Sequence, residues 1–191
     1  AKAEFNFRSR ALDGVTVANV TTTDGKLALI TVAADGGLSM RFDAAGATMP
    51  NSGGLPFSRL GEPNAVGGKV AFIGFHKDTT NLDDFRGVYV LDGDTLQTIA
   101  DPSTELPRIG TFEGSSSQVA FDGTSVAFWG THGSIQAGDL KAGIFVSEVG
   151  GPITAIVVNG DTIPGTAKTI RNFQSPPAIQ GDSVYLVAFD E

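Results

Sequence analysis

Two histidines are the side chains of this chain best suited to proton transfer or metal binding near neutral pH. His76 and His132 are separated by an offset of 56 (132 − 76), and each ends a Gly-x-His sequence that closes an apolar run. Imidazoles on one rim of a fold could share a metal ion, or act as an acid and a base. The alternative is that one ancestral histidine was copied together with a repeated unit, so that neither histidine needs to be a ligand.

The single tryptophan, Trp129, is the best candidate for a flat surface on which a sugar ring could stack. Together with His76 and His132 it defines a candidate ligand face. The alternative role is packing between repeated units, because Trp129 occupies the position that Ile73 holds in the preceding unit, at the same offset as the two histidines.

Carboxylates in polar loops offer a second kind of chemistry. Asp83 and Asp84 precede Arg86, and Asp139 precedes Lys141 in the corresponding later loop. Such groups could bind calcium or hydrolyse a glycosidic bond, although an acidic loop followed by a cation is more often a solvated turn. The sequence has no cysteine, no G-x-S-x-G and no phosphate-binding glycine loop. We therefore predict no catalytic residue and no resident cofactor, with calcium as the one candidate ion.

These candidate residues recur because the chain repeats itself. Gly-Val-Tyr-Val at 87–90 recurs as Gly-Ile-Phe-Val at 143–146, and the apolar run at 67–75 recurs at 122–131 and, more faintly, at 181–189. Pro50, Pro107 and Pro164 are evenly spaced at an offset of 57 (107 − 50 and 164 − 107). Self-similarity at a fixed period of this length predicts a repeat architecture.

The repeated unit has the pattern of short antiparallel strands. Apolar and polar residues alternate at 87–91, Asp-Gly at 92–93 predicts a hairpin turn, and no long segment has helical periodicity. We predict an all-β fold of β-propeller-like repeats, with four strands in each full copy. A stacked β-solenoid and a single β-sandwich are the alternatives. One domain over 1–191 would then hold roughly three and a half blades.

The predicted copies are the repeats 1–50, 51–107 and 108–164 and the half repeat 165–191. A half blade exposes an apolar face and an unpaired strand edge, and both features invite a partner. We therefore predict self-association through five apolar residues of the half repeat: Phe173, Val184, Tyr185, Leu186 and Val187.

Composition excludes some classes of partner. The formal net charge of −8 disfavours phosphate backbones and anionic lipid, and no apolar stretch is long enough for a membrane span. We therefore expect neither nucleic-acid binding nor membrane insertion. The absence of cysteine suits an extracellular or cell-surface protein, which we expect to be a mature form whose signal peptide has been removed.

Asn64, Gly68, Ala71 and Phe72 resemble the motif of bacterial tandem-repeat proteins named for N-x-x-G-x-x-A-F. The resemblance implies a secreted, propeller-like repeat protein carried on the cell surface. Our leading hypothesis is thus a non-enzymatic extracellular structural or adhesive protein that self-associates by strand or blade complementation and forms fibres. The alternative is a carbohydrate- or protein-binding propeller module. A third hypothesis, supported only by the loop carboxylates, is a glycan-active enzyme.

Overall fold

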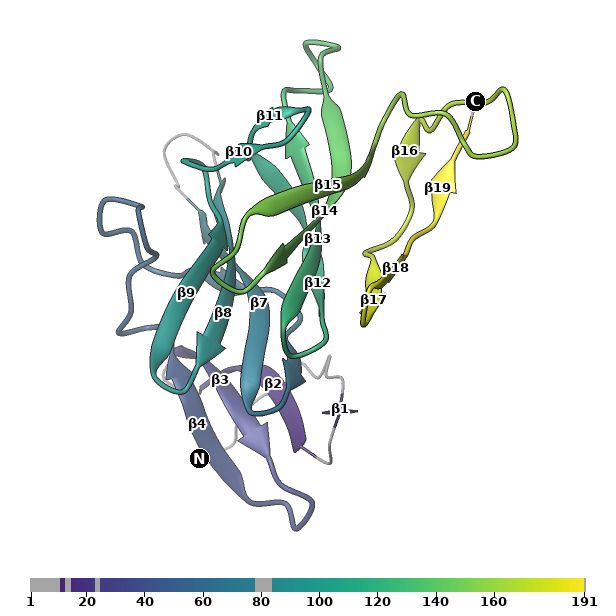
Figure 1. Ribbon diagram of the computed structural model, residues 1–191. Helices are drawn as coiled ribbons and strands as arrows, with labels where there is room; N and C mark the ends of the chain where they lie inside the picture. Colours follow the sequence, from purple (N-terminus) through teal and green to yellow (C-terminus); the bar gives the residue numbers. More distant parts are fainter. Residues whose placement is uncertain (1–10, 13–14, 23–24, 78–83, 191) are drawn as a thin grey trace.

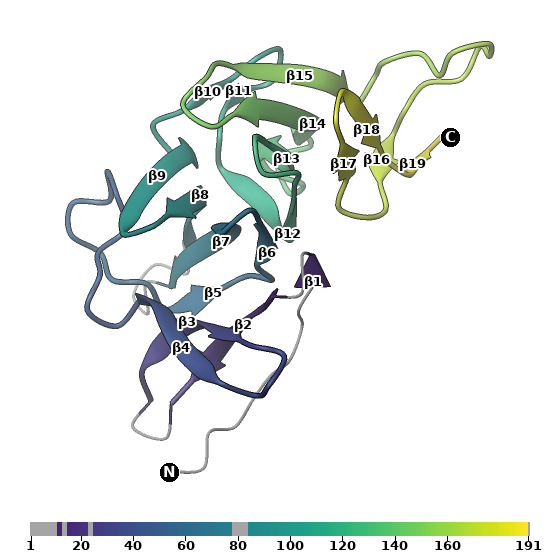
Figure 2. The ribbon, with the colours of Figure 1, turned by 60° about the horizontal axis from the view of Figure 1, so that its bottom comes forward.

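The computed structural model describes residues 11–12, 15–22, 25–77 and 84–190, and every regular element in these residues is a β-strand (Figure 1). The all-β prediction is therefore confirmed at the level of fold class. The strands form three antiparallel sheets that follow one another along the chain, and a C-terminal hairpin lies beyond the third (Figure 2).

Each of the three sheets is built from strands that follow one another along the chain. The first sheet has the order β1-β2-β3-β4, with β1 (Ala11–Leu12), β2 (Val15–Thr21), β3 (Leu27–Val32) and β4 (Leu38–Asp43). In the second sheet β7 (Lys69–Lys77) pairs with β5 (Arg59–Leu60), β6 (Asn64–Val66) and β8 (Asp84–Asp92), and β9 (Thr95–Ala100) follows β8. The third sheet has β12 (Gly114–Phe121), β13 (Ser125–His132), β14 (Lys141–Glu148) and β15 (Ile153–Val158).

Shorter pairs of strands complete the described chain. The second and third sheets are joined through a small hairpin of β10 (Glu105–Leu106) and β11 (Gly110–Thr111). The C-terminal hairpin consists of β16 (Asn172–Phe173), β17 (Ala178–Gln180), β18 (Ser183–Tyr185) and β19 (Ala188–Phe189). In this hairpin β17 pairs with β18, and β16 pairs with β19.

Apolar side chains fill the space between successive sheets. One buried cluster joins the first and second sheets and includes Leu29, Phe72 and Tyr89. A second cluster joins the second and third sheets and includes Ile73 and Phe145, and another lies between the third sheet and the C-terminal hairpin. Because side chains alternate between the two faces of a strand, each sheet can contribute to the cluster on either side of it.

The three recurring prolines lie in turns of the same kind. In each turn the residue after proline has a positive φ, the signature of a type II turn: Asn51 (58°), Arg108 (75°) and Gly165 (78°). In each turn the fourth residue donates its N–H to the carbonyl of the first: Ser52 to Met49, Ile109 to Leu106 and Thr166 to Ile163. Proline presets the φ that the second turn position needs, so the turn explains the recurrence of proline.

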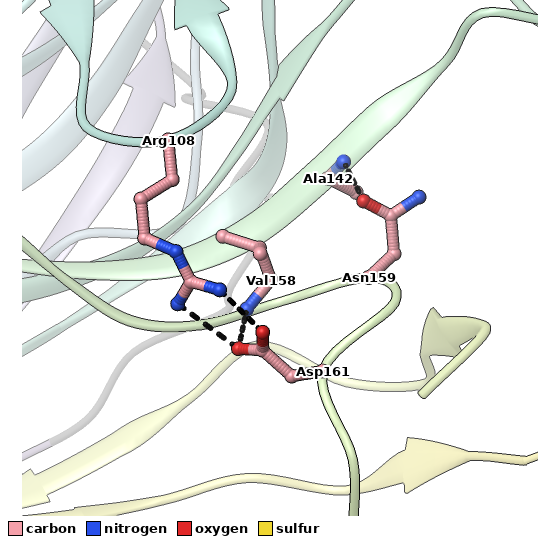
Figure 3. Close-up of polar contacts among 5 residues, drawn as sticks. All are labelled: Arg108, Ala142, Val158, Asn159 and Asp161. Atoms are coloured by element: carbon pink, nitrogen blue, oxygen red, sulfur yellow. Dashed lines mark hydrogen bonds and ion pairs between the residues drawn. The ribbon is translucent and has the colours of Figure 1, made fainter. Parts of the chain in front are cut away.

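Two of these turns also fasten the segment between two sheets to the end of the later sheet. Asn51, before the second sheet, donates from Nδ2 to Asp101 Oδ2 at 2.7 Å, just after the last strand of that sheet. Arg108, at the equivalent position of the next turn, donates from both terminal nitrogens to Asp161, after the last strand of the third sheet (Figure 3). Asp161 also accepts the N–H of Val158 at 3.0 Å. We refer to these two contacts as the inter-sheet clamps.

The two clamp carboxylates sit in different surroundings. Asp101 is only 1% exposed, and its burial raises its pKa; hydrogen bonds from Ser103, Asn51 and Thr104 outweigh that effect, so the pKa lies below its usual value. The pKa of Asp161 is also lowered, first by the hydrogen bonds from Arg108, but this pair lies at the surface.

Cross-strand glycine pairs make room for aromatic rings in the core. Gly74 pairs with Gly87, and a Cβ atom on either would meet the ring of Tyr89. In the third sheet Gly130 pairs with Gly143, and a Cβ atom on either would meet the ring of Phe145, at 3.2 and 2.9 Å. The recurrence of Gly-x-Tyr and Gly-x-Phe therefore has a packing cause.

The first sheet has a different combination of residues at the equivalent positions. Val20 pairs with Ala28 where the other sheets have their glycine pairs, and Ile30 stands in place of the aromatic residue. All three side chains are at most 8% exposed. The first sheet therefore has valine and alanine where the other two sheets have paired glycines, and it has the smaller isoleucine where they have an aromatic ring.

We expect Tyr89→Phe to stabilise the protein. The Tyr89 hydroxyl is buried without a hydrogen-bond partner in the described structure, and burial followed by the charge of Asp101 raises its pKa. Removing an unsatisfied buried hydroxyl should add about 1 kcal/mol to the free energy of unfolding. Urea denaturation at pH 7 measures this gain, and a loss of stability would mean that the hydroxyl has a partner in solution.

Candidate functional site

The most unusual surface of the described chain is the outward face of the C-terminal hairpin. Tyr185, Val187 and Phe189 alternate along its last strand segment and are 59%, 50% and 45% exposed. The intervening Val184 and Leu186 point the other way, into the cluster that the hairpin shares with the third sheet. We call the surface formed by Tyr185, Val187 and Phe189 the tail face.

The tail face corresponds to positions that are buried elsewhere in the same chain. Positions 185, 187 and 189 follow Ala71, Ile73 and Phe75 by exactly two repeat periods, since 185 − 71 is twice 57. The hairpins match as well, since Ile179 pairs with Val184 in the later one as Ala65 pairs with Val70 in the earlier one. Ala71, Ile73 and Phe75 are at most 2% exposed because the third sheet covers them.

The hairpin edge beside the tail face has no strand partner in the described residues. β18 pairs only with β17, and β19 pairs only with β16. The corresponding strands β7 and β13 are each paired on both sides. A strand edge with unpaired N–H and C=O groups is a template for a further strand.

A groove of about 460 Å³ lies between this edge and the third sheet. Val146 and Ile156 line it from the third sheet, Val184 lines it from the hairpin, and the carboxylates of Glu148 and Asp182 add charge. The counterparts of Val146 and Ile156 in the second sheet are Val90 and Ile99, and these are 0% and 7% exposed. The groove therefore occupies the space that the next sheet fills elsewhere.

The five residues predicted for self-association divide into two groups. Tyr185 and Val187 are exposed on the tail face, whereas Phe173 is 3% exposed and packs inward with Val184 and Leu186. Phe189 belongs to the tail face but is not among the five residues predicted for self-association. The alternation that starts at Tyr185 and Val187 was the signal that could have identified it.

The two histidines lie on different sheets, and each contacts a main-chain carbonyl close to its own sheet. His76 Nδ1 lies 2.8 Å from the carbonyl oxygen of Pro56, and His132 Nδ1 lies 3.0 Å from that of Thr111. His132 also lies 3.2 Å from a carboxylate oxygen of Glu113. Among the described residues, no group of three or more His, Asp or Glu side chains is placed to hold a metal ion.

Trp129 is partly buried and packs in the cluster between the third sheet and the C-terminal hairpin. Its Nε1 is buried and has no hydrogen-bond partner in the described structure. The indole is therefore engaged in packing. Of the loop carboxylates, Asp83 lies outside the described residues, and Asp139 accepts the N–H of Ser134 at 2.8 Å within its own loop.

Comparison with protein-family models, with curated proteins and with solved structures found no match to this chain. Within the described residues there is no helix with the length and apolar character that a membrane span requires. Since no similar protein suggests a function, a functional proposal rests on the geometry of the tail face and groove.

Proposed function

We propose that this chain is a non-enzymatic, extracellular structural or adhesive repeat protein that self-associates through its C-terminal hairpin. The observation that carries the proposal is the exposure of Tyr185, Val187 and Phe189 at positions whose counterparts, Ala71 and Ile73 among them, are fully buried by a neighbouring sheet. Covering apolar side chains of this kind with a partner lowers the free energy of the complex, because apolar surface is removed from water. The unpaired edge beside them can add main-chain hydrogen bonds to the same contact.

We further propose that the sheets are blades of a propeller-type arrangement. Antiparallel sheets of four, five and four strands follow one another and pack face to face through shared apolar clusters. The strands at one edge of these sheets lie next to one another, since β6 contacts both β1 and β12, and Glu62 forms a parallel bridge with Gln118. Radial stacking of four-stranded sheets with their first strands inward is the plan of a propeller. The secreted location rests on the resemblance at Asn64, Gly68 and Ala71.

A carbohydrate- or protein-binding module is the second candidate, and the groove is the observation that favours it. Its apolar floor at Val146 and Ile156, with polar groups at Glu148 and Asp182, has the mixed character of a ligand site. A peptide strand suits it better than a sugar, because the hairpin edge beside it offers main-chain groups and Trp129 is engaged in packing.

Light scattering on a size-exclusion column tests the proposal. We expect the unmodified chain to form dimers or larger assemblies whose mass rises with concentration. The double variant Tyr185→Lys/Val187→Lys should weaken association on the order of 100-fold, as expected when central apolar contacts of an interface are lost. Ile135→Lys is the matched control, because Ile135 is an apolar residue 80% exposed in a loop.

A monomer at every concentration would contradict self-association. In that case peptide and glycan binding to the groove would become the function to measure, with Ile156→Lys as the variant expected to abolish it.

A further inference from the structure

The first sheet carries an exposed apolar surface of its own. Leu38 and Met40 on β4 are 57% and 61% exposed. Leu38 pairs with Val32 and Met40 pairs with Ile30, so the four side chains lie on one face of the sheet. We call the exposed surface formed by Leu38 and Met40 the head face.

The positions that correspond to the head face are partly buried in the other two sheets. By strand register Leu38 corresponds to Leu96 and Ile153, each of which lies near the start of the last strand of its sheet, opposite the end of the strand before it. Leu96 packs in the cluster between the first and second sheets, and Ile153 packs in the cluster between the second and third. In both cases this position faces the preceding sheet.

Met40 follows the same rule. By register it corresponds to Thr98 in the second sheet and to Ala155 in the third, since Met40 pairs with Ile30 as Ala155 pairs with Phe145. Ala155 packs in the cluster that the third sheet shares with the second. The head face is therefore the surface with which a sheet of this chain contacts the sheet before it.

The contact between two successive sheets has two surfaces, and the tail face corresponds to the surface that the earlier sheet contributes. Ala71, Ile73 and Phe75 mark the surface with which a sheet contacts the sheet after it, and Tyr185, Val187 and Phe189 continue that surface at the C-terminal hairpin. The chain makes this contact twice internally, between its first and second and between its second and third sheets.

We infer that a second copy of the chain covers the tail face with its own head face, so that copies associate head to tail. This inference rests on the proposed self-association and adds its orientation. The described residues of each copy offer one face of each kind, so the contact is heterologous: a rotation that closes gives a ring, and one that does not close gives a filament.

Mixing two blocked variants tests the orientation. The head variant, Leu38→Asp/Met40→Asp, keeps an intact tail face, and the tail variant, Tyr185→Asp/Val187→Asp, keeps an intact head face. Each variant alone should be monomeric by light scattering. An equimolar mixture should give a one-to-one dimer that grows no further, because only one productive contact remains. Ile135→Asp should assemble as the unmodified chain does.

The outcomes separate this inference from the proposed function. If the unmodified chain assembles and the head variant assembles equally well, the contact joins two tail faces; the orientation is then wrong and self-association stands. If both variants are monomeric but the mixture forms no dimer, the two faces do not bind each other and the inference is overturned. A monomeric unmodified chain overturns self-association itself.

Thiol cross-linking gives a second measurement in the same preparation. The sequence has no cysteine, so Met40→Cys in one copy and Val187→Cys in another introduce the only thiols. A short bismaleimide should join these two copies much faster than it joins Ile135→Cys to Val187→Cys. Equal rates for the two pairs would also overturn the head-to-tail contact.

Discussion

Gly87→Ala is expected to lower the free energy of unfolding by about 3 kcal/mol, at the upper end of what overpacking of a core costs. The reason is local: a Cβ atom on Gly87 would overlap the ring and hydroxyl of Tyr89, which follows on the same face of the strand. The ring cannot move aside, because Phe57 and Phe72 pack against it with centroids 5.7 and 5.8 Å away. Urea denaturation followed by circular dichroism measures the loss.

A double-mutant cycle identifies the cause. The first sheet has Ala28 and Ile30 where the second has Gly87 and Tyr89, so Gly87→Ala/Tyr89→Ile reproduces that combination. We expect the double variant to be more stable than the sum of the two single changes predicts, by about 1 kcal/mol of coupling or more. Additive effects would show that the ring of Tyr89 and the Cβ atom added at position 87 do not compete for the same space.

Gly46→Ala is the matched glycine control. The nearest atom to a Cβ at Gly46 is a carboxylate oxygen of Asp43 at 3.5 Å, and Gly46 is not among the residues with positive φ. Its substitution should change stability by less than about 0.5 kcal/mol, as is usual for surface sites without special geometry.

The sequence predicted the fold class and the recurrence because both depend on local chemistry. Proline recurs at 50, 107 and 164 because a type II turn needs its fixed φ, and that preference acts within a single turn. The alternation around Tyr185 and Val187 likewise follows from the two faces of a strand. Such features can be predicted from neighbouring residues in the sequence.

Other features depend on contacts between distant segments and could not be predicted in that way. The sequence grouped Phe173 with Tyr185 as association residues, but only the placement of the hairpin on the third sheet buries the former and exposes the latter. The groove at Val146 and Ile156 has the same origin, because the equivalent positions in the second sheet are covered. The inter-sheet clamps could not be predicted from the sequence, because Asn51 and Arg108 differ in residue type and share only their turn position.

Asp101→Ala should destabilise the protein by about 3 kcal/mol, whereas Asp161→Ala should cost less than about 1 kcal/mol. The two carboxylates hold equivalent clamps, but Asp101 is 1% exposed and accepts hydrogen bonds from Asn51, Ser103 and Thr104. Removing it takes away the buried charged acceptor that Ser103 and Asn51, which are exposed, share with the half-buried Thr104, and hydrogen bonds to a charged group are among the stronger ones. Asp161 pairs with Arg108 at the surface, where water replaces the lost contact.

The pH dependence of stability shows whether Asp101 stabilises the fold through its negative charge or only through packing. Because the pKa of Asp101 is lower in the folded state, its stabilising effect is complete above the unfolded-state pKa, about 3.9, and is lost as the pH falls from there through the folded-state value. The difference in stability between the unmodified chain and Asp101→Ala should therefore be largest near pH 7 and shrink below about pH 4. Urea denaturation of both proteins from about pH 7 to about pH 2.5 measures it. A difference that stays constant over this range would show that Asp101 stabilises the fold by its shape alone, and that the Asn51 clamp does not depend on its charge.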